Sequence, residues 1–306
     1  MKSSKGFVTV ATGNTRYYKM AHNLLLSYKY HSKTPTPFVI LCDRQNEWTS
    51  GFDQVVIIKE PSYSYMDKMR IFDLSPFEET IFIDADSLVY RDLDLLWELF
   101  KDGPDVGLLG STFPLTSDKG WWDVKNLGEL KDFVNYKMMC QGGIYYVRNN
   151  GKELPAFLDT CQFVKDHYFE YKFQFCESVL ADENIISIAS CVHHFIPIKN
   201  WVDVFAYYPV TKLFVHDILS GILEYGWAES PGNRYKDSVL IHFGTLCAMN
   251  RWVYKKEVFK LKRGPVGLSN LWDYLLLRIN HMWGKLQMSY YRVFDKKRKF
   301  TMEIYS

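Results

Sequence analysis

The chain has 306 residues, of which 47% are hydrophobic and 24% are charged, and its formal net charge is +2. This balance is typical of a globular protein, and it does not fit a chain that binds nucleic acid through an overall excess of basic residues. The length allows one large α/β domain with an appendage, or two modest domains.

Nothing in the sequence predicts export or a membrane span. No apolar run is long enough to cross a bilayer, and residues 1–5 lead into a strand-like segment without a signal-peptide pattern. Scattered cysteines without a CxxC pair are typical of buried thiols in a reducing compartment. The six cysteines are Cys42, Cys140, Cys161, Cys176, Cys191 and Cys247. We therefore expect a cytoplasmic protein.

In chain order, apolar and β-branched segments predict strands at residues 6–12, 37–43, 54–59, 80–86, 105–110, 142–149 and 238–244. Apolar residues at helical spacing and the flanking residues predict helices at residues 17–31, 92–101, 153–169 and 177–189. Strands that alternate with helices indicate βαβ units. We therefore expect an α/β fold with a mixed, mostly parallel central sheet flanked by helices.

The composition changes after about residue 246. Residues 271–306 hold seven Lys or Arg and three Asp or Glu, and a helical face there carries Trp272, Leu276, Ile279, Trp283, Leu286 and Tyr290. This pattern is typical of a helix on an anionic membrane surface, and it also fits a C-terminal helix that packs on its own domain. We expect a domain at residues 1–250 and a helical, basic and aromatic extension at 251–306, which would make the protein peripheral on the inner face of the cytoplasmic membrane if it contacts lipid.

Two aspartates end an apolar segment in IFIDADSL, residues 81–88. Side chains two apart on a strand point the same way, so Asp84 and Asp86 would converge if the strand continues through them. At the carboxyl end of a strand they would lie where open α/β sheets bind ligands, and two carboxylates suit Mg²⁺ or Mn²⁺. A solvated turn is the alternative, because a lone DxD arises often by chance.

Three further features favour a metal and phosphate site. His242 ends the last predicted strand, and Mn²⁺ accepts an imidazole ligand. Lys68 comes sixteen residues before Asp84 and could reach a diphosphate as a point charge. The segment ATGNTRYY at residues 11–18 closes the first strand with small residues and then offers Tyr17 for stacking on a base.

Together these segments resemble the GT-A glycosyltransferases of family 8, which include glycogenin and bacterial lipopolysaccharide galactosyl- and glucosyltransferases. The resemblance rests on ATGN with a tyrosine, the lysine before DAD, CQGGIYYV, ADEN and IHFG in this order, and it covers residues 6–252. It implies a Rossmann-like GT-A fold. It also implies a metal-dependent hexosyltransferase of polysaccharide biosynthesis, with a UDP-sugar donor, a saccharide or glycolipid acceptor and retention of anomeric configuration.

The resemblance also implies roles for individual residues. Mn²⁺, or Mg²⁺, would be held by Asp84, Asp86 and His242, while Gln141 and Asp182 would act beside the reacting sugar. The residues implied to bind the donor are Ala11, Thr12, Asn14, Tyr17, Lys68, Asp84, Ala85, Asp86, Glu183, Gly244 and Arg251.

Two departures from the family pattern stand out. Gln141 replaces an Asn, which lengthens the side chain beside the anomeric carbon. In HFGTLCAMNRW, Gly244 comes one position early and Arg251 stands in for the family's diphosphate-binding lysine.

Two other functions stay open. A strand that ends in DxD also resembles the nucleophile motif of haloacid-dehalogenase-like phosphatases. That motif usually lies near the N-terminus and is followed by Thr or Val, whereas Ser87 follows here. A GT-A-like protein that binds sugar nucleotides without turnover is the second alternative.

Overall fold

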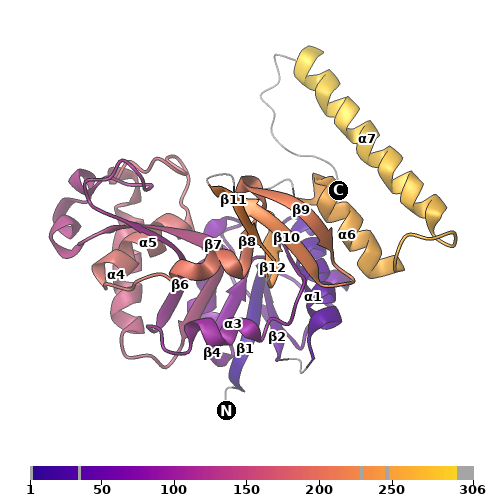
Figure 1. Ribbon diagram of the computed structural model, residues 1–306. Helices are drawn as coiled ribbons and strands as arrows, with labels where there is room; N and C mark the ends of the chain where they lie inside the picture. Colours follow the sequence, from indigo (N-terminus) through magenta and orange to yellow (C-terminus); the bar gives the residue numbers. More distant parts are fainter. Residues whose placement is uncertain (1–2, 34–35, 228–229, 237, 245–247, 295–306) are drawn as a thin grey trace.

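The structure is a computed structural model that describes residues 3–33, 36–227, 230–236, 238–244 and 248–294. Its centre is a six-stranded sheet in the order β3-β2-β1-β4-β7-β6 (Figure 1). Five of its strands run in the same direction, whereas β7 runs antiparallel to both of its neighbours. The strands are β1 (Ser3–Ala11), β2 (Phe38–Cys42), β3 (Gln54–Ile57), β4 (Phe77–Ile83), β6 (Val106–Phe113) and β7 (Lys137–Arg148).

Both faces of the central sheet are covered, because its strands are apolar on both sides. In β1, Phe7 packs into the cluster that includes α1 and α3, and the next residue, Val8, packs into the cluster of α4 and α5. The helices are α1 (Thr15–His31), α2 (Ile71–Leu74), α3 (Leu95–Phe100), α4 (Leu154–Asp166), α5 (Asp182–Val192), α6 (Trp252–Arg263) and α7 (Leu271–Phe294). The predicted α/β fold with a mostly parallel central sheet is confirmed.

Two small sheets complete the fold. One is antiparallel and consists of β9 (Thr211–Asp217), β10 (Ile222–Trp227) and β11 (Ser230–Tyr235), none of which the sequence analysis predicts. The other has the order β5-β12-β8 and consists of β5 (Ser87–Val89), β12 (Leu240–His242) and β8 (Phe205–Tyr207). This second sheet brings residue 242 next to the turn that follows β4.

The C-terminal helices differ in how they contact the rest of the chain. Helix α6 joins the core, where Asn23 Nδ2 donates a hydrogen bond to the hydroxyl of Tyr254 (3.1 Å). Helix α7 lies at the edge of the molecule beside α6 (Figure 1). Within the described residues, no helix combines the length and apolar character needed to cross a membrane. The five described cysteines are free thiols, and Cys247 lies outside the described residues.

Candidate metal centre

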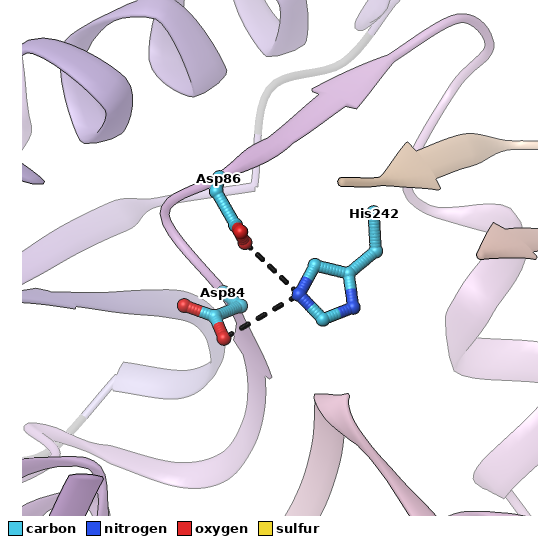
Figure 2. Close-up of side chains that lie close together, drawn as sticks. All are labelled: Asp84, Asp86 and His242. Carbon is cyan, nitrogen blue, oxygen red and sulfur yellow. Dashed lines mark ion pairs between the residues drawn. The ribbon is translucent and has the colours of Figure 1, made fainter. Parts of the chain in front are cut away.

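Two aspartates from one turn and a histidine from much later in the chain meet just beyond the end of β4 (Figure 2). The imidazole Nε2 of His242 lies 2.9 Å from Asp86 Oδ1 and 3.6 Å from Asp84 Oδ2. One ligand atom from each residue lies within 4.8 Å of the others. Two carboxylate oxygens and an imidazole nitrogen are a ligand set that a divalent ion such as Mn²⁺ accepts.

A tight turn and a short strand pair place these side chains. Strand β4 ends at Ile83, and the backbone N–H of Ser87 donates to the carbonyl of Asp84 (3.1 Å) to close a turn. β5 then pairs with β12 so that Ser87 lies opposite His242. The expectation that the strand continues through both aspartates is therefore wrong. The turn, rather than the pleat of a strand, brings their carboxylates toward one imidazole.

Within the described residues, this group contains a buried acceptor that receives no hydrogen bond. Asp86 Oδ1 is buried, and its contact with His242 lacks the geometry of a hydrogen bond. A buried polar atom without a partner costs about 1–3 kcal/mol, and more when it is charged. A cation coordinated by Asp86 Oδ1 would remove this penalty, so the residues present fit a divalent metal ion.

Lys68 adds a positive charge to the group. It lies on a 3₁₀ helix (Tyr65–Arg70), and its Nζ is 2.6 Å from Asp84 Oδ2. Burial raises the pKa of the Asp84 carboxyl, but Lys68 and His242 outweigh burial and bring that pKa well below its usual range. Burial lowers the pKa of His242, but Asp86 and Asp84 outweigh it and raise the pKa to about 10. The carboxylates thus attract positive charge strongly.

A second acidic pair begins α5. Asp182 Oδ2 accepts a hydrogen bond from the hydroxyl of Tyr145 (2.6 Å) and lies 3.9 Å from Lys68 Nζ. Glu183 accepts a hydrogen bond from the backbone N–H of Gly142. Burial, followed by the charge of Asp182, raises the pKa of Glu183 to about 7. Lys68 therefore stands between the Asp84 carboxylate and this acidic pair.

The residues expected to contact uridine lie together at the carboxyl end of β1, the strand next to β4. Ala11 is the buried last residue of that strand, and Thr12 Oγ1 donates to Asp67 Oδ2 (2.6 Å). The side chain of Asn14 caps α1 by accepting a hydrogen bond from the backbone N–H two residues later (2.9 Å). Tyr17 follows in the first turn of α1 and is half-buried.

The remaining predicted residues are Ala85, Gln141, Gly244 and Arg251, and they differ in burial and in their contacts. Ala85 is buried in the turn between the two aspartates, and Gln141 is half-buried in β7. Gly244 has a φ of +57°, in the left-handed region that favours glycine. Arg251 is exposed, with its guanidinium 5.6 Å from the ring centre of Tyr208. Among the described contacts, none joins Arg251 to the acidic groups.

Three polar residues of this region receive no role in the sequence analysis: Asp43, Asp67 and Tyr145. Asp43 follows β2 and accepts a hydrogen bond from the backbone N–H of Gly13 (2.9 Å), which holds the loop after β1. Its position directly after an apolar strand is the signal that could have identified it. Asp67 has no such signal, because it lies on a short 3₁₀ helix, and Tyr145 reads as core in the sequence.

A scan against protein-family models and a search of curated proteins found no match to this chain. Among solved structures, the apo form of WbbM, a bifunctional glycosyltransferase, matches with 12% identity and a TM-score of 0.50. The match covers 87% of this chain and 52% of WbbM, so the chain spans about half the length of that protein.

Two further structures match at similar identity. An active-site mutant of LgtC matches with 11% identity and a TM-score of 0.49, over 87% of this chain and 98% of LgtC. The apo form of mouse xyloside xylosyltransferase 1 matches with 9% identity and a TM-score of 0.44, over 67% of this chain and 87% of that one. The similarity to WbbM shows the shared GT-A-like fold.

Proposed function

We propose that this chain is a metal-dependent glycosyltransferase related to family 8, which transfers a hexose from a UDP-sugar to a saccharide or glycolipid acceptor with retention. The observation that carries the proposal is the group of Asp84, Asp86 and His242, with Lys68 beside it. The group lies at the carboxyl end of a strand in the central sheet, where open α/β sheets bind their ligands.

In this proposal residues 1–250 form the catalytic domain and residues 251–306 form the C-terminal extension. Asp84, Asp86 and His242 would hold Mn²⁺ or Mg²⁺, which when bound supplies positive charge to the diphosphate as the sugar departs. Lys68 Nζ would donate a hydrogen bond to a departing phosphate oxygen. Gly244 and Arg251, which follow β12, would complete the diphosphate side.

The second acidic pair acts on the sugar. As the glycosidic bond to phosphate breaks, positive charge develops on the sugar ring. The side-chain carbonyl of Gln141 and the carboxylate of Asp182 would stabilise that charge. Tyr145 fixes Asp182 through its hydroxyl, and Gly142 fixes Glu183, whose carboxylate would accept hydrogen bonds from sugar hydroxyls.

At the other end of the donor, the loop after β1 would hold the nucleoside. Ala11 and Thr12 would contact uridine, and Asn14 would keep the start of α1 in place for it. The ring of Tyr17 would stack on the base. This assignment is supported by the placement of β1 beside β4, which puts the loop after β1 and the metal group at the same edge of the sheet.

The release of UDP from UDP-glucose and UDP-galactose tests the proposal, with Mn²⁺ and with chelator. We expect slow release that requires metal and is abolished by Asp86→Asn. The matched control is Asp73→Asn, at an exposed carboxylate on α2, which should keep full activity. Full activity of Asp86→Asn would contradict the proposal.

The same assay distinguishes the two alternatives. A phosphatase would cleave a phosphomonoester such as p-nitrophenyl phosphate and leave UDP-sugars intact. A binding module without turnover would be stabilised against heat by UDP-sugar and metal together, yet release no UDP.

A further inference from the structure

We infer that α7 binds an anionic membrane surface through an apolar stripe that points away from the rest of the chain. The exposed stripe consists of seven large side chains that are each 39–70% exposed: Trp272, Leu275, Leu276, Ile279, Met282, Trp283 and Leu286. At about 100° per residue they fall within an arc of about 120° on the helix. This inference does not depend on the proposed transfer activity.

The opposite face of α7 is the one that packs on the domain. Trp252 of α6 lies 5.7 Å from Tyr274 and 5.4 Å from His281 between ring centres, and His281 is only 7% exposed. These positions lie about half a turn from the middle of the exposed stripe. Packing on α6 therefore uses one face of α7, and the exposed apolar stripe lies on the other.

Hydrogen bonds of Asn270 fix the connection between α6 and α7 and thereby hold α7 in this orientation. Asn270 Oδ1 accepts a hydrogen bond from the backbone N–H of Gly267 (2.9 Å), and its Nδ2 donates to the carbonyls of Arg263 and Pro265 (3.0 Å each). In the same turn Leu268 is 96% exposed, which extends the apolar surface beyond the helix.

The net charge of α6 and α7 selects the partner of the exposed stripe. Residues 251–294 carry nine Lys or Arg and two Asp or Glu, and one of the two acids, Glu257, is fully buried. Lys262, Arg263, Arg278 and Lys285 are all exposed, and the Arg278 guanidinium lies 5.4 Å from the ring centre of Trp252, on the side of α7 that packs on α6. A second copy of the chain would bring the same positive charge against itself, whereas anionic lipid offers negative headgroups above apolar tails.

The two tryptophans support this assignment. Trp272 and Trp283 lie about three turns apart on the same stripe, and tryptophan favours the boundary between headgroups and tails. The predicted Tyr290 and the basic run at residues 296–299 lie outside the residues whose side chains the structure describes.

Co-sedimentation of the full chain with vesicles tests the inference. The vesicles contain equal parts of phosphatidylglycerol and phosphatidylcholine, or phosphatidylcholine alone. We expect binding to the anionic vesicles that weakens with salt. Ile279→Glu, on the exposed stripe, should weaken it about tenfold or more.

The matched control is Asn280→Glu, which adds the same charge at the next, exposed position outside the stripe and should weaken binding less than about threefold. Trp283→Ala removes apolar surface without adding charge and should also weaken binding about tenfold. Unchanged thermal unfolding midpoints would show that all three variants fold.

Three results would overturn the inference. The first is no binding of the intact chain to anionic vesicles, or equal binding to phosphatidylcholine alone. The second is equal binding of Ile279→Glu and Asn280→Glu. The third is a dimer, seen by light scattering without vesicles, that Ile279→Glu dissociates, because it would assign the stripe to a second copy.

Discussion

At the residue scale, the candidate site depends on positions that lack a side chain. An added Cβ on Gly142 would lie 2.3 Å from Glu183 Oε1, and one on Gly143 would lie 2.6 Å from His242 Nδ1. Both distances are shorter than any ordinary contact. These neighbouring glycines of β7 therefore allow the acidic pair and the imidazole to approach the strand from its two faces.

Gly142→Ala tests whether activity depends on the position of the Glu183 carboxylate. The added methyl displaces the Glu183 carboxylate and breaks its bond to the backbone N–H, so we expect UDP release to fall about a hundredfold, as when a well-placed active-site group moves by about 1 Å. The matched control is Gly232→Ala, where an added Cβ meets nothing within 4 Å. Equal activity of the two variants would exclude a role for the position of Glu183.

At the element scale, the central strands are predictable and the small hairpin strands are not. The inner strands of the central sheet are largely buried on both faces and appear as apolar runs, such as the fully buried β2. Strand β9 is only partly buried along its whole length, so neither an apolar run nor an alternating pattern marks it. The end of β4 at Ile83 was not predicted, because the turn after it is closed by a backbone hydrogen bond, which any residue can make.

The candidate site also contains residues that a sequence pattern can identify and one that it cannot. Asp84, Asp86 and His242 could be grouped because each lies at or just beyond the end of an apolar strand, although the pairing that joins them is between β12 and β5 in the small sheet. Tyr145 could not be assigned, because its ring packs in the core while only its hydroxyl reaches Asp182. The position of Tyr145 on the strand does not show that its ring belongs to the core while its hydroxyl contacts Asp182.

One buried acid ties α6 to the hairpin of β9 and β10. Glu257 is fully buried, accepts a hydrogen bond from the backbone N–H of Ile218 (2.6 Å) and lies 3.1 Å from Lys260 Nζ. Glu257→Ala would leave the buried backbone N–H of Ile218 unpaired, whereas Lys260 would keep its contact with Asp217 (2.6 Å), and the free energy of unfolding should fall by roughly 1–3 kcal/mol. Urea unfolding measures the change.

Lys256→Ala is the control for that measurement, since Lys256 is a half-buried residue of the same helix and its truncation should change stability by no more than about 0.5 kcal/mol. If Glu257→Ala is as stable as this control, α6 is held in place by its apolar contacts alone.

At the scale of the whole molecule, the metal group joins the first half of the chain to its last strands. Without metal, the pKa of His242 is raised to about 10, so protonation of its imidazole stabilises the folded state. This stabilisation is fully present below about pH 6.5, the ordinary pKa of histidine, and it is lost as pH rises toward about 10. A metal ligand must be the neutral imidazole, so metal has to displace that proton.

Stabilisation by Mn²⁺ should therefore grow with pH. The apparent affinity should rise about tenfold per pH unit between about pH 6.5 and about pH 8, and a hundredfold excess over Kd adds about 2.7 kcal/mol to the free energy of unfolding. Thermal unfolding with Mn²⁺ and with chelator measures this, and Asp86→Asn should show no dependence on Mn²⁺. A shift that shrinks as pH rises would show that His242 is not a ligand.

The pairing of β5 with β12 has a consequence for the order in which the protein matures. Ser87 and Asp86 leave the ribosome long before His242, so an emerging chain can build β1 to β4 while the third ligand is still unsynthesised. The pairing of β5 with β12 closes a long stretch of chain, and it therefore forms late in folding. The chain entropy is lost before the pairing contributes any stabilisation. All three ligands can then hold the ion only after β12 has been inserted between β5 and β8, which makes metal uptake a marker of the assembly of that sheet.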